Sequence, residues 1–229
     1  MNTHSTQSEV SRMPLVFSKK NGVTEQLHRL RRSIAQHQTD SEHATPTVGI
    51  CSSTPREGAT TTLLNLAAQA VSLGERVLLI DANLRTPRLH AMFNLKPAPG
   101  FTDLVLSRAS HDKVVQRTGK EKLMLVSCGS VVQNTESLLN FPGLPMLIGE
   151  FRRIADLVLV DLPPVNPSIE AGLVGQALDQ VYLVIQAEKS RWEVVSNAKE
   201  QLNSYSVNLC GAVLNRRRHY IPEWLYNKL

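Results

Sequence analysis

The sequence predicts an α/β fold, a three-layer sandwich with a mostly parallel central sheet and helices on both faces. The main observation is an alternation along the chain, in which short, almost wholly apolar runs are separated by stretches with apolar residues at helical spacing. Strands that are apolar throughout are typical of parallel sheets, because helices bury both faces of such a sheet. The length agrees, since 229 residues of which 42% are apolar can bury one sizeable core.

Six apolar runs are the expected strands, and four amphipathic stretches are the expected helices between them. The strands are predicted at residues 47–51, 76–80, 123–126, 157–160, 181–185 and 209–214. The helices are predicted at residues 60–72, 142–154, 169–177 and 192–202. We expect Tyr182, Trp192 and Val195 to lie in the core. Residues 97–133 have the least regular pattern, and we interpret them as an insertion over the site.

The two ends of the chain are predicted to lie outside the main domain. Residues 1–23 are polar and have no sustained period, which indicates a flexible arm. A short helix follows, with apolar residues at helical spacing over 27–34. We therefore expect one domain over residues 24–215 and a basic tail with a short helix over residues 216–229.

Composition excludes several classes of protein. No apolar run reaches the length of about 18 residues that a membrane span needs. The first residues lack the apolar segment of a signal peptide. Cys51, Cys128 and Cys210 are widely spaced and odd in number, so they indicate neither a disulfide framework nor a metal site. We expect a cytoplasmic protein.

The formal net charge of +5 is mild and lies mostly near the C-terminal end. From Lys189 onward there are seven Lys or Arg residues against three Asp or Glu residues, and Arg216, Arg217 and Arg218 are consecutive. This asymmetry is consistent with an acidic partner, with an anionic membrane surface, or with a plainly solvated tail.

Residues 52–62 connect an expected strand to an expected helix and read Ser-Ser-Thr-Pro-Arg-Glu-Gly-Ala-Thr-Thr-Thr. This place and composition are typical of a P-loop, whose backbone N–H groups and helix N-terminus hold phosphates. The usual loop ends in Gly-Lys-Ser/Thr, but alanine stands here at the lysine position. The nucleotide-binding residues expected in the loop are Pro55, Arg56, Glu57, Gly58, Ala59, Thr60 and Thr61.

Two acidic residues close apolar strands of the predicted sheet. Asp81 follows the run at 77–80, and Asp161 follows the run at 157–160. Ligands of open parallel sheets sit at the carboxyl ends of the strands. An acid at such an end can hold Mg²⁺ beside the hydroxyl that follows the lysine position, which here belongs to Thr60. We therefore predict a metal site made of Thr60, Asp81 and Asp161.

The segment over residues 77–87 resembles the second Walker motif, Asp-x-Asp-x-Arg-x-Pro, of the bacterial tyrosine kinases. These P-loop autokinases accompany the machinery that exports capsule and exopolysaccharide. Residues 159–164 are similar to the Asp-x-Pro-Pro Walker B motif of the family, and residues 99–105 match a further family segment. The resemblance covers roughly residues 24–222.

The resemblance implies a nucleotide cofactor, ATP or ADP with Mg²⁺, and assigns roles to individual residues. Asp81 and Asn83 occupy the catalytic positions of the second Walker motif. Asn215 ends a segment that looks like the last core strand of the family, whose asparagine contacts adenine. Tyr220 and Tyr226 are the candidates for autophosphorylation in the tail.

The chain departs from the family pattern at functional positions. Ala59 replaces the lysine that holds the transferring phosphate, and Asn83 replaces the second acid of the Asp-x-Asp pair. An asparagine brings no negative charge and cannot serve as a base at neutral pH. Only Tyr220 and Tyr226 remain of the tyrosine-rich tail. We therefore expect weak or lost nucleotide binding and little or no kinase activity, unless Arg56 substitutes for the lysine.

The function implied is that of a tyrosine-kinase-like protein of exopolysaccharide biosynthesis, and we favour a pseudokinase. The expected partner is the cytoplasmic tail of a membrane co-polymerase that determines chain length, which places the protein at the inner membrane, and we expect no nucleic-acid partner. Residues 25–31 match the self-association helix of the family, with His28 at one arginine position. The alternatives are an active tyrosine autokinase and a partitioning or septum-positioning ATPase, although the latter carries a lysine where this chain has Thr54.

Overall fold

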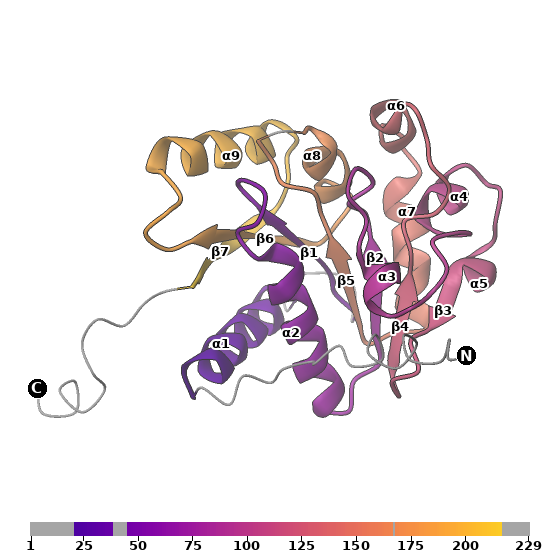
Figure 1. The fold of residues 1–229 in the computed structure, drawn as a ribbon, viewed down its shortest axis with the longest axis horizontal. Helices are drawn as coiled ribbons and strands as arrows, with labels where there is room; N and C mark the ends of the chain where they lie inside the picture. The colour runs from indigo at the N-terminus through magenta and orange to yellow at the C-terminus, as the bar shows by residue number, and fades with distance from the viewer. Residues whose placement is uncertain (1–20, 39–44, 167, 217–229) are drawn as a thin grey trace, which may run out of the picture.

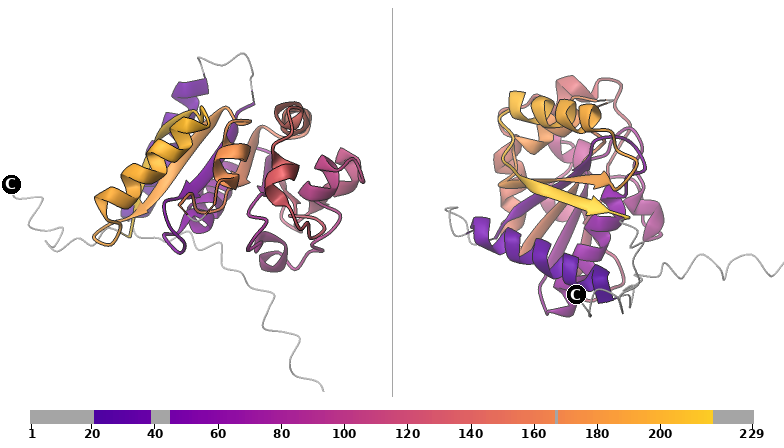
Figure 2. Two further views of the ribbon diagram at one scale, coloured as in Figure 1. Left: turned by 90° about the horizontal axis from the view of Figure 1, so that it is seen from above. Right: turned by 90° about the vertical axis from the view of Figure 1, so that its left-hand side faces the viewer.

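The computed structural model describes residues 21–38, 45–166 and 168–216, and it confirms the α/β fold. A seven-stranded sheet has the order β3-β4-β2-β5-β1-β6-β7, and every neighbouring pair is parallel except β3 with β4. Helices lie on both sides of this sheet, as Figure 1 and Figure 2 show. The strands are β1 (Thr47–Ser52), β2 (Val77–Asp81), β3 (Val115–Arg117), β4 (Leu123–Val126), β5 (Leu157–Asp161), β6 (Gln180–Gln186) and β7 (Leu209–Asn215).

The helices differ widely in length. The three longest are α1 (Asn21–Gln38), α2 (Ala59–Ser72) and α9 (Trp192–Ser204). The others, with one 3₁₀ turn, are α3 (Leu89–Met92), α4 (Phe101–Val105), α5 (His111–Val114), α6 (Thr135–Leu139), α7 (Leu144–Gly149), η1 (Glu150–Arg153) and α8 (Glu170–Gly175).

The sheet separates two apolar cores, because residues of its central strands face both ways. One core lies under α1 and α2 and includes Ile34, Leu63 and Leu79. The other lies under α4 and α6 to α9 and includes Phe101 and Phe151, both almost fully buried. In the right-hand view of Figure 2, α9 lies on one side of the sheet and α1 on the other. Fully buried strands such as β2 and β5 are therefore apolar up to their final aspartate, as the sequence indicated.

Three expectations about the elements need correction. Trp192 was expected in the core, but its side chain is 77% exposed at the first position of α9. The helix expected over residues 142–154 is shorter, because α7 is followed by the 3₁₀ turn η1. Residues 97–133 are more regular than expected: they contain α4, α5 and the antiparallel edge strand β3 besides β4. Tyr182, 2% exposed, does lie in the core.

Helix α1 is fixed to the domain by both apolar and polar contacts. Leu30 and Ile34 are buried in the core beside α2. Arg31 forms an ion pair with Glu75, which follows α2. The Tyr182 hydroxyl in β6 lies 3.1 Å from the Ser33 hydroxyl, so the helix is also linked to the sheet. Most of the polar face of α1 stays in solvent, including the exposed His28.

Candidate functional site

Strand order brings the predicted P-loop and both acidic residues to one edge of the sheet. Strands β2, β5 and β1 are neighbours, and all three are parallel, so their carboxyl ends lie together. Asp81 stands opposite Asp161 in the register of β2 and β5, and Ile50 of β1 stands opposite Asp161 on its other side. The loop that follows β1 therefore begins beside both acids.

The loop leads into α2 with the geometry that an anion site needs. Gly58 is the N-cap residue, with φ of 100°, a left-handed conformation that favours glycine, and no side chain caps the helix. The first N–H groups of a helix have no intrahelical partners, so they are available to a phosphate. A Cβ at Gly58 would lie 2.2 Å from Asn215 Nδ2, so a larger residue here would displace the Asn215 amide from the Glu57 carbonyl.

Ala59 occupies the lysine position of the loop and is 8% exposed. Its methyl group belongs to the core under α2. Among the other loop residues, Pro55, Arg56 and Thr61 are exposed, and Arg56 adopts a left-handed conformation with φ of 71°. The site therefore has no lysine side chain from this loop, and the Arg56 guanidinium forms no hydrogen bond or ion pair with the described residues.

Thr60 and Asp161 are directly connected. The Thr60 hydroxyl donates to the Asp161 carboxylate, with O···O distances of 2.9 and 3.2 Å. Burial and the nearby charge of Asp81 raise the pKa of Asp161 to about 8, although the hydrogen bond from Thr60 acts in the opposite direction. Burial beside a second acid therefore favours the protonated form of the Asp161 carboxyl.

Asp81 is fully buried and is held by backbone groups of the following loop. Its Oδ2 accepts from the N–H groups of Arg88 at 3.0 Å and Leu89 at 2.9 Å, and its Oδ1 accepts from the N–H of Asn83 at 3.3 Å. Burial raises the pKa of Asp81 above its usual value, while these hydrogen bonds lower it. Two acids and a hydroxyl thus meet at this point, and the charge of Arg88 only partly offsets the mutual repulsion of the acids.

This donor set fits Mg²⁺. Carboxylate and hydroxyl oxygens are the ligands that Mg²⁺ takes, usually together with water and substrate phosphates. The raised pKa of Asp161 reflects the unfavourable burial of negative charge next to Asp81, and a divalent cation would relieve it. Thr60, Asp81 and Asp161, the three residues predicted from the sequence, are the ones that would hold the metal.

Asn83 lies in the same loop, but its amide is engaged locally. Asn83 Oδ1 accepts from the backbone N–H of Thr86 at 3.3 Å and from the Thr86 hydroxyl at 3.2 Å. The side chain therefore stabilises the turn between β2 and α3, a common use of asparagine in loops.

Asn215 is the expected adenine-contacting residue, and both ends of its amide have partners in the chain. Asn215 Nδ2 donates to the Glu57 carbonyl at 2.8 Å, and Oδ1 accepts from the Arg216 N–H at 2.8 Å. The end of β7 is thereby fixed to the P-loop. Arg216 also donates to Gln186 Oε1 at 3.2 Å.

A buried acid that the sequence did not single out, Glu170, lies near the second Walker motif. Its carboxylate accepts from Arg85 Nε at 2.8 and 3.0 Å, from the Ser168 hydroxyl at 2.6 Å and from the Thr135 hydroxyl. Burial raises the pKa of Glu170, but the hydrogen bonds of Ser168, Thr135 and Arg85 outweigh it and lower the pKa. The arginine of the Asp-x-Asp-x-Arg-like run therefore connects its loop to α8.

Several predicted functional residues lie outside the described part of the chain. Tyr220, Tyr226 and the arginines at 217 and 218 belong to residues 217–229. The side chain of Glu25 is likewise outside it. Arg31, the last arginine of the self-association motif, is bound to Glu75 within the chain.

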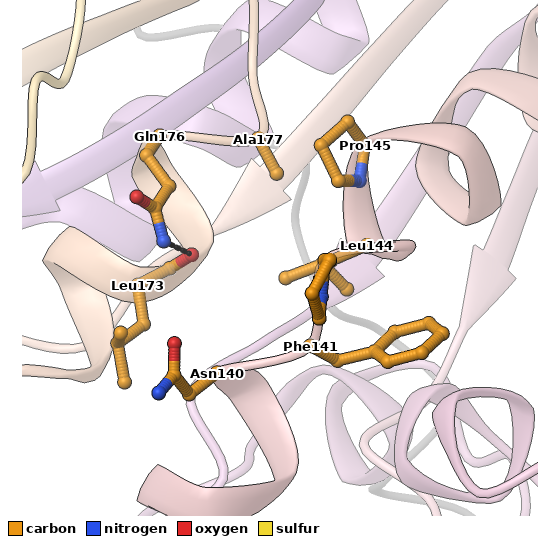
Figure 3. A pocket seen from close by; sticks show the side chains of 8 residues that line it. Asn140, Phe141, Leu144, Pro145, Leu173, Gln176 and Ala177 are labelled. Carbon is orange, nitrogen blue, oxygen red and sulfur yellow. Dashed lines mark hydrogen bonds between the residues drawn. The ribbon is translucent and has the colours of Figure 1, made fainter.

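A surface pocket of about 340 Å³ lies elsewhere, between the segment that joins α6 to α7 and helix α8. Figure 3 shows Phe141, Leu144 and Pro145 on one side and Leu173 and Gln176 on the other. No P-loop residue and neither acid lines it. The pocket is thus separate from the candidate nucleotide site.

Within the described ranges, no three or more His, Cys, Asp or Glu side chains gather into a cluster that could hold a metal ion. Over the same residues, no helix has both the length and the apolar character needed to cross a bilayer.

Comparisons with known proteins agree with the motifs. The chain is 32% identical over 195 residues to tyrosine-protein kinase YwqD of Bacillus subtilis, covering 85% of this chain and 81% of that protein. It is 29% identical over 161 residues to tyrosine-protein kinase CpsD of Streptococcus agalactiae, covering 70% of each. The solved kinase domain of the Escherichia coli tyrosine kinase ETK superposes with a TM-score of 0.74 at 27% identity, covering 86% of this chain and 78% of that one. No family model matches the chain. Motifs, fold and relatives together place the chain in the family of bacterial tyrosine kinases of capsule and exopolysaccharide biosynthesis.

Proposed function

We propose that this protein is a pseudokinase: it binds a magnesium nucleotide but does not transfer phosphate at a kinase rate. The observation that carries this proposal is the buried Ala59 at the lysine position of an otherwise well-formed P-loop. The turn-forming role of Asn83 supports it, since the second acid of the Walker motif is also lost.

The two losses act mainly on catalysis. Phosphoryl transfer depends almost entirely on positioning and on stabilising negative charge. Removing one preorganised stabilising group typically lowers the rate by about 10²–10³-fold. Losing the second acid adds to this, although such effects are not additive. The combined loss lowers phosphate transfer far below that of a complete site.

Binding of the nucleotide is affected less. The N-terminus of α2 still offers N–H groups to phosphates, and Thr60, Asp81 and Asp161 still offer oxygen ligands. When bound, Mg²⁺ would neutralise phosphate charge and join the nucleotide to these three residues. We therefore infer that ATP or ADP with Mg²⁺ is the ligand, with weaker affinity than in a complete P-loop.

A binding protein of this family would act through its partners. By the resemblance to the tyrosine kinases, we infer that it regulates or scaffolds a membrane co-polymerase that determines polysaccharide chain length. It would bind the cytoplasmic tail of that partner and so lie at the inner membrane, with no role in nucleic-acid binding. Helix α1 exposes His28 to solvent and is the surface we assign to self-association.

An active tyrosine autokinase is the second candidate, and the retained metal ligands favour it. In that case another cation, such as Arg56, would have to replace the missing lysine. The partitioning ATPases are less compatible with the chain, because Thr54 stands where they carry a lysine.

Phosphate transfer separates the candidates. Purified protein is incubated with Mg-ATP, and phosphotyrosine is detected in wild type and in Asp81→Ala. We expect no signal above that of the variant. A wild-type signal that disappears in Asp81→Ala, or in Tyr220→Phe combined with Tyr226→Phe, would show an active kinase and contradict the pseudokinase proposal.

A further inference from the structure

Glu57 lies in the middle of the P-loop, yet its side chain is turned away from solvent. The residue is 4% exposed, whereas its neighbours Pro55 and Arg56 are exposed. A buried carboxylate is costly unless polar groups surround it. The hydrogen-bond donors around Glu57 therefore indicate the role of this residue.

Two of the donors come from the loop itself. The Ser53 hydroxyl lies 2.9 and 2.8 Å from the two carboxylate oxygens of Glu57, and the Thr54 N–H donates to Oε2 at 3.0 Å. These bonds close the loop upon itself across four residues. Its bend is thereby fixed before any ligand arrives.

The third donor comes from a distant part of the chain. The Ser190 hydroxyl, in the turn between β6 and α9, donates to Glu57 Oε1. The same hydroxyl accepts from the Gln186 N–H at 2.9 Å, at the end of β6. Ser190 thus connects the last residue of a central strand to the carboxylate inside the loop.

Further contacts hold the loop from neighbouring strands. Asn215, at the end of β7, donates to the Glu57 carbonyl at 2.8 Å. Asn166, after β5, donates through Nδ2 to the Ser53 carbonyl at 2.8 Å and to the Val194 carbonyl at 3.0 Å. The first turn of α9 is therefore attached to the loop at a second point.

We propose that Glu57 and Ser190 are positioning residues that hold the P-loop in its phosphate-binding shape and couple it to the turn between β6 and α9. The proposal deepens the proposed function, because it names what keeps the loop in shape when its lysine is absent. In most P-loops the lysine contacts the phosphates, so here the backbone N–H groups carry more of the binding and their arrangement matters more.

The test removes the Ser190 hydroxyl and measures how fast the backbone amides of the P-loop exchange their hydrogens. Amide hydrogen exchange over residues 53–60 is compared in ligand-free wild type, Ser190→Ala and Glu57→Gln. Both variants should exchange about 10-fold faster in this segment, since a hydrogen bond to a charged group is lost and the loop opens more often. Ser190→Thr keeps the hydroxyl and should restore protection.

The matched control is Ser196→Ala in α9, the helix that follows this turn. The Ser196 hydroxyl lies 3.4 Å from Glu200 Oε1, and within the described residues it forms no hydrogen bond with the loop. It should leave exchange over residues 53–60 unchanged. Equal exchange in wild type and Ser190→Ala, or equal acceleration by Ser196→Ala, would overturn the proposal.

Calorimetric titration with Mg-ADP gives a second measurement, the dissociation constant. This constant would not change if Glu57 and Ser190 only stabilised the fold. Ser190→Ala should raise the dissociation constant for Mg-ADP about 10-fold, and Ser190→Thr should restore the wild-type value. Faster loop exchange with an unchanged dissociation constant would overturn the positioning role. Failure of wild type to bind Mg-ADP would contradict the proposed function, while hydrogen exchange would still decide whether Glu57 and Ser190 hold the loop.

Discussion

Glu57 and Asp161 are both buried carboxyl groups beside the same loop, but their surroundings differ. Glu57 accepts hydrogen bonds from Ser53, Thr54 and Ser190. Asp161 accepts from one side-chain hydroxyl, that of Thr60, and faces the like charge of Asp81, which outweighs the opposing charge of Arg88. The first acid is satisfied by the protein, and the second is not.

This difference in surroundings distinguishes an acid that supports the fold from an acid suited to binding a ligand. A carboxylate surrounded by donors stabilises the fold and has no need of a ligand. A carboxylate buried next to a second acid destabilises the fold until a cation or a proton neutralises it. The P-loop has therefore kept the hydrogen bonds that hold its shape, and the acid beside it still favours a bound cation. Both features remain even though Ala59 replaces the lysine.

The largest expected effect comes from removing the unsatisfied charge. The pKa of Asp161 is about 8 in the folded chain, far above its unfolded value, so the folded state retains a proton that the unfolded state has released. Without metal, stability is therefore highest below the unfolded pKa and falls as pH rises towards 8. Asp161→Asn should remove this loss and raise the free energy of unfolding at pH 8 by on the order of 3 kcal/mol.

Urea unfolding at pH 5 and pH 8 in the presence of a chelator measures this. Wild type should be less stable at pH 8 than at pH 5, and Asp161→Asn should show a smaller difference. Asp179→Asn is the contrasting variant, because burial raises the pKa of Asp179 but the hydrogen bonds of Arg152 and Thr47 lower it overall. An equal pH slope in wild type and Asp161→Asn would show that Asp161 is not the unsatisfied acid.

Removing the carboxylate of Glu57, the acid that is surrounded by donors, should lower the stability of the fold instead of raising it. Glu57→Ala leaves the hydroxyls of Ser53 and Ser190 without their acceptor, and we expect destabilisation of about 2 kcal/mol. Thermal unfolding at pH 7 compares it with Glu136→Ala, an exposed acid outside the loop. Stabilisation by Glu57→Ala would mean that both acids are unsatisfied and would remove the contrast between them.

A smaller effect is expected at Glu170, which resembles Glu57 in being surrounded by donors. Its partner Arg85 is 57% exposed in its side chain, and Ser168 and Thr135 remain when the arginine is removed. Arg85→Ala should therefore cost about 1 kcal/mol of stability. Denaturant unfolding beside Arg117→Ala, a control at an exposed position, checks it. A loss as large as that of Glu57→Ala would mean that Arg85 is the main support of Glu170.

The sequence predicts the central strands and the meeting of Thr60, Asp81 and Asp161, because apolar runs and strand-end acids are local signals. It does not predict α3 to α6, since helices of four or five residues are too short to show a period. The role of Glu57 is hidden for another reason. Its partners Ser190 and Asn215 are 133 and 158 residues away, so only the fold brings them together.

The exposure of Trp192 is a similar case. Its place in an amphipathic helix favours burial, but its side chain is 77% exposed, and the first turn of α9 is attached to the P-loop through Asn166 instead. The apolar period of a helix alone does not report which of its turns the rest of the fold covers.

The most direct test of nucleotide binding by the altered P-loop is a calorimetric titration of wild type and Ala59→Lys with Mg-ADP. We expect saturable binding by wild type that is lost when a chelator removes the metal, with tighter binding by Ala59→Lys. Binding by Ala59→Lys alone would show that the native pocket no longer holds nucleotide and would contradict the account.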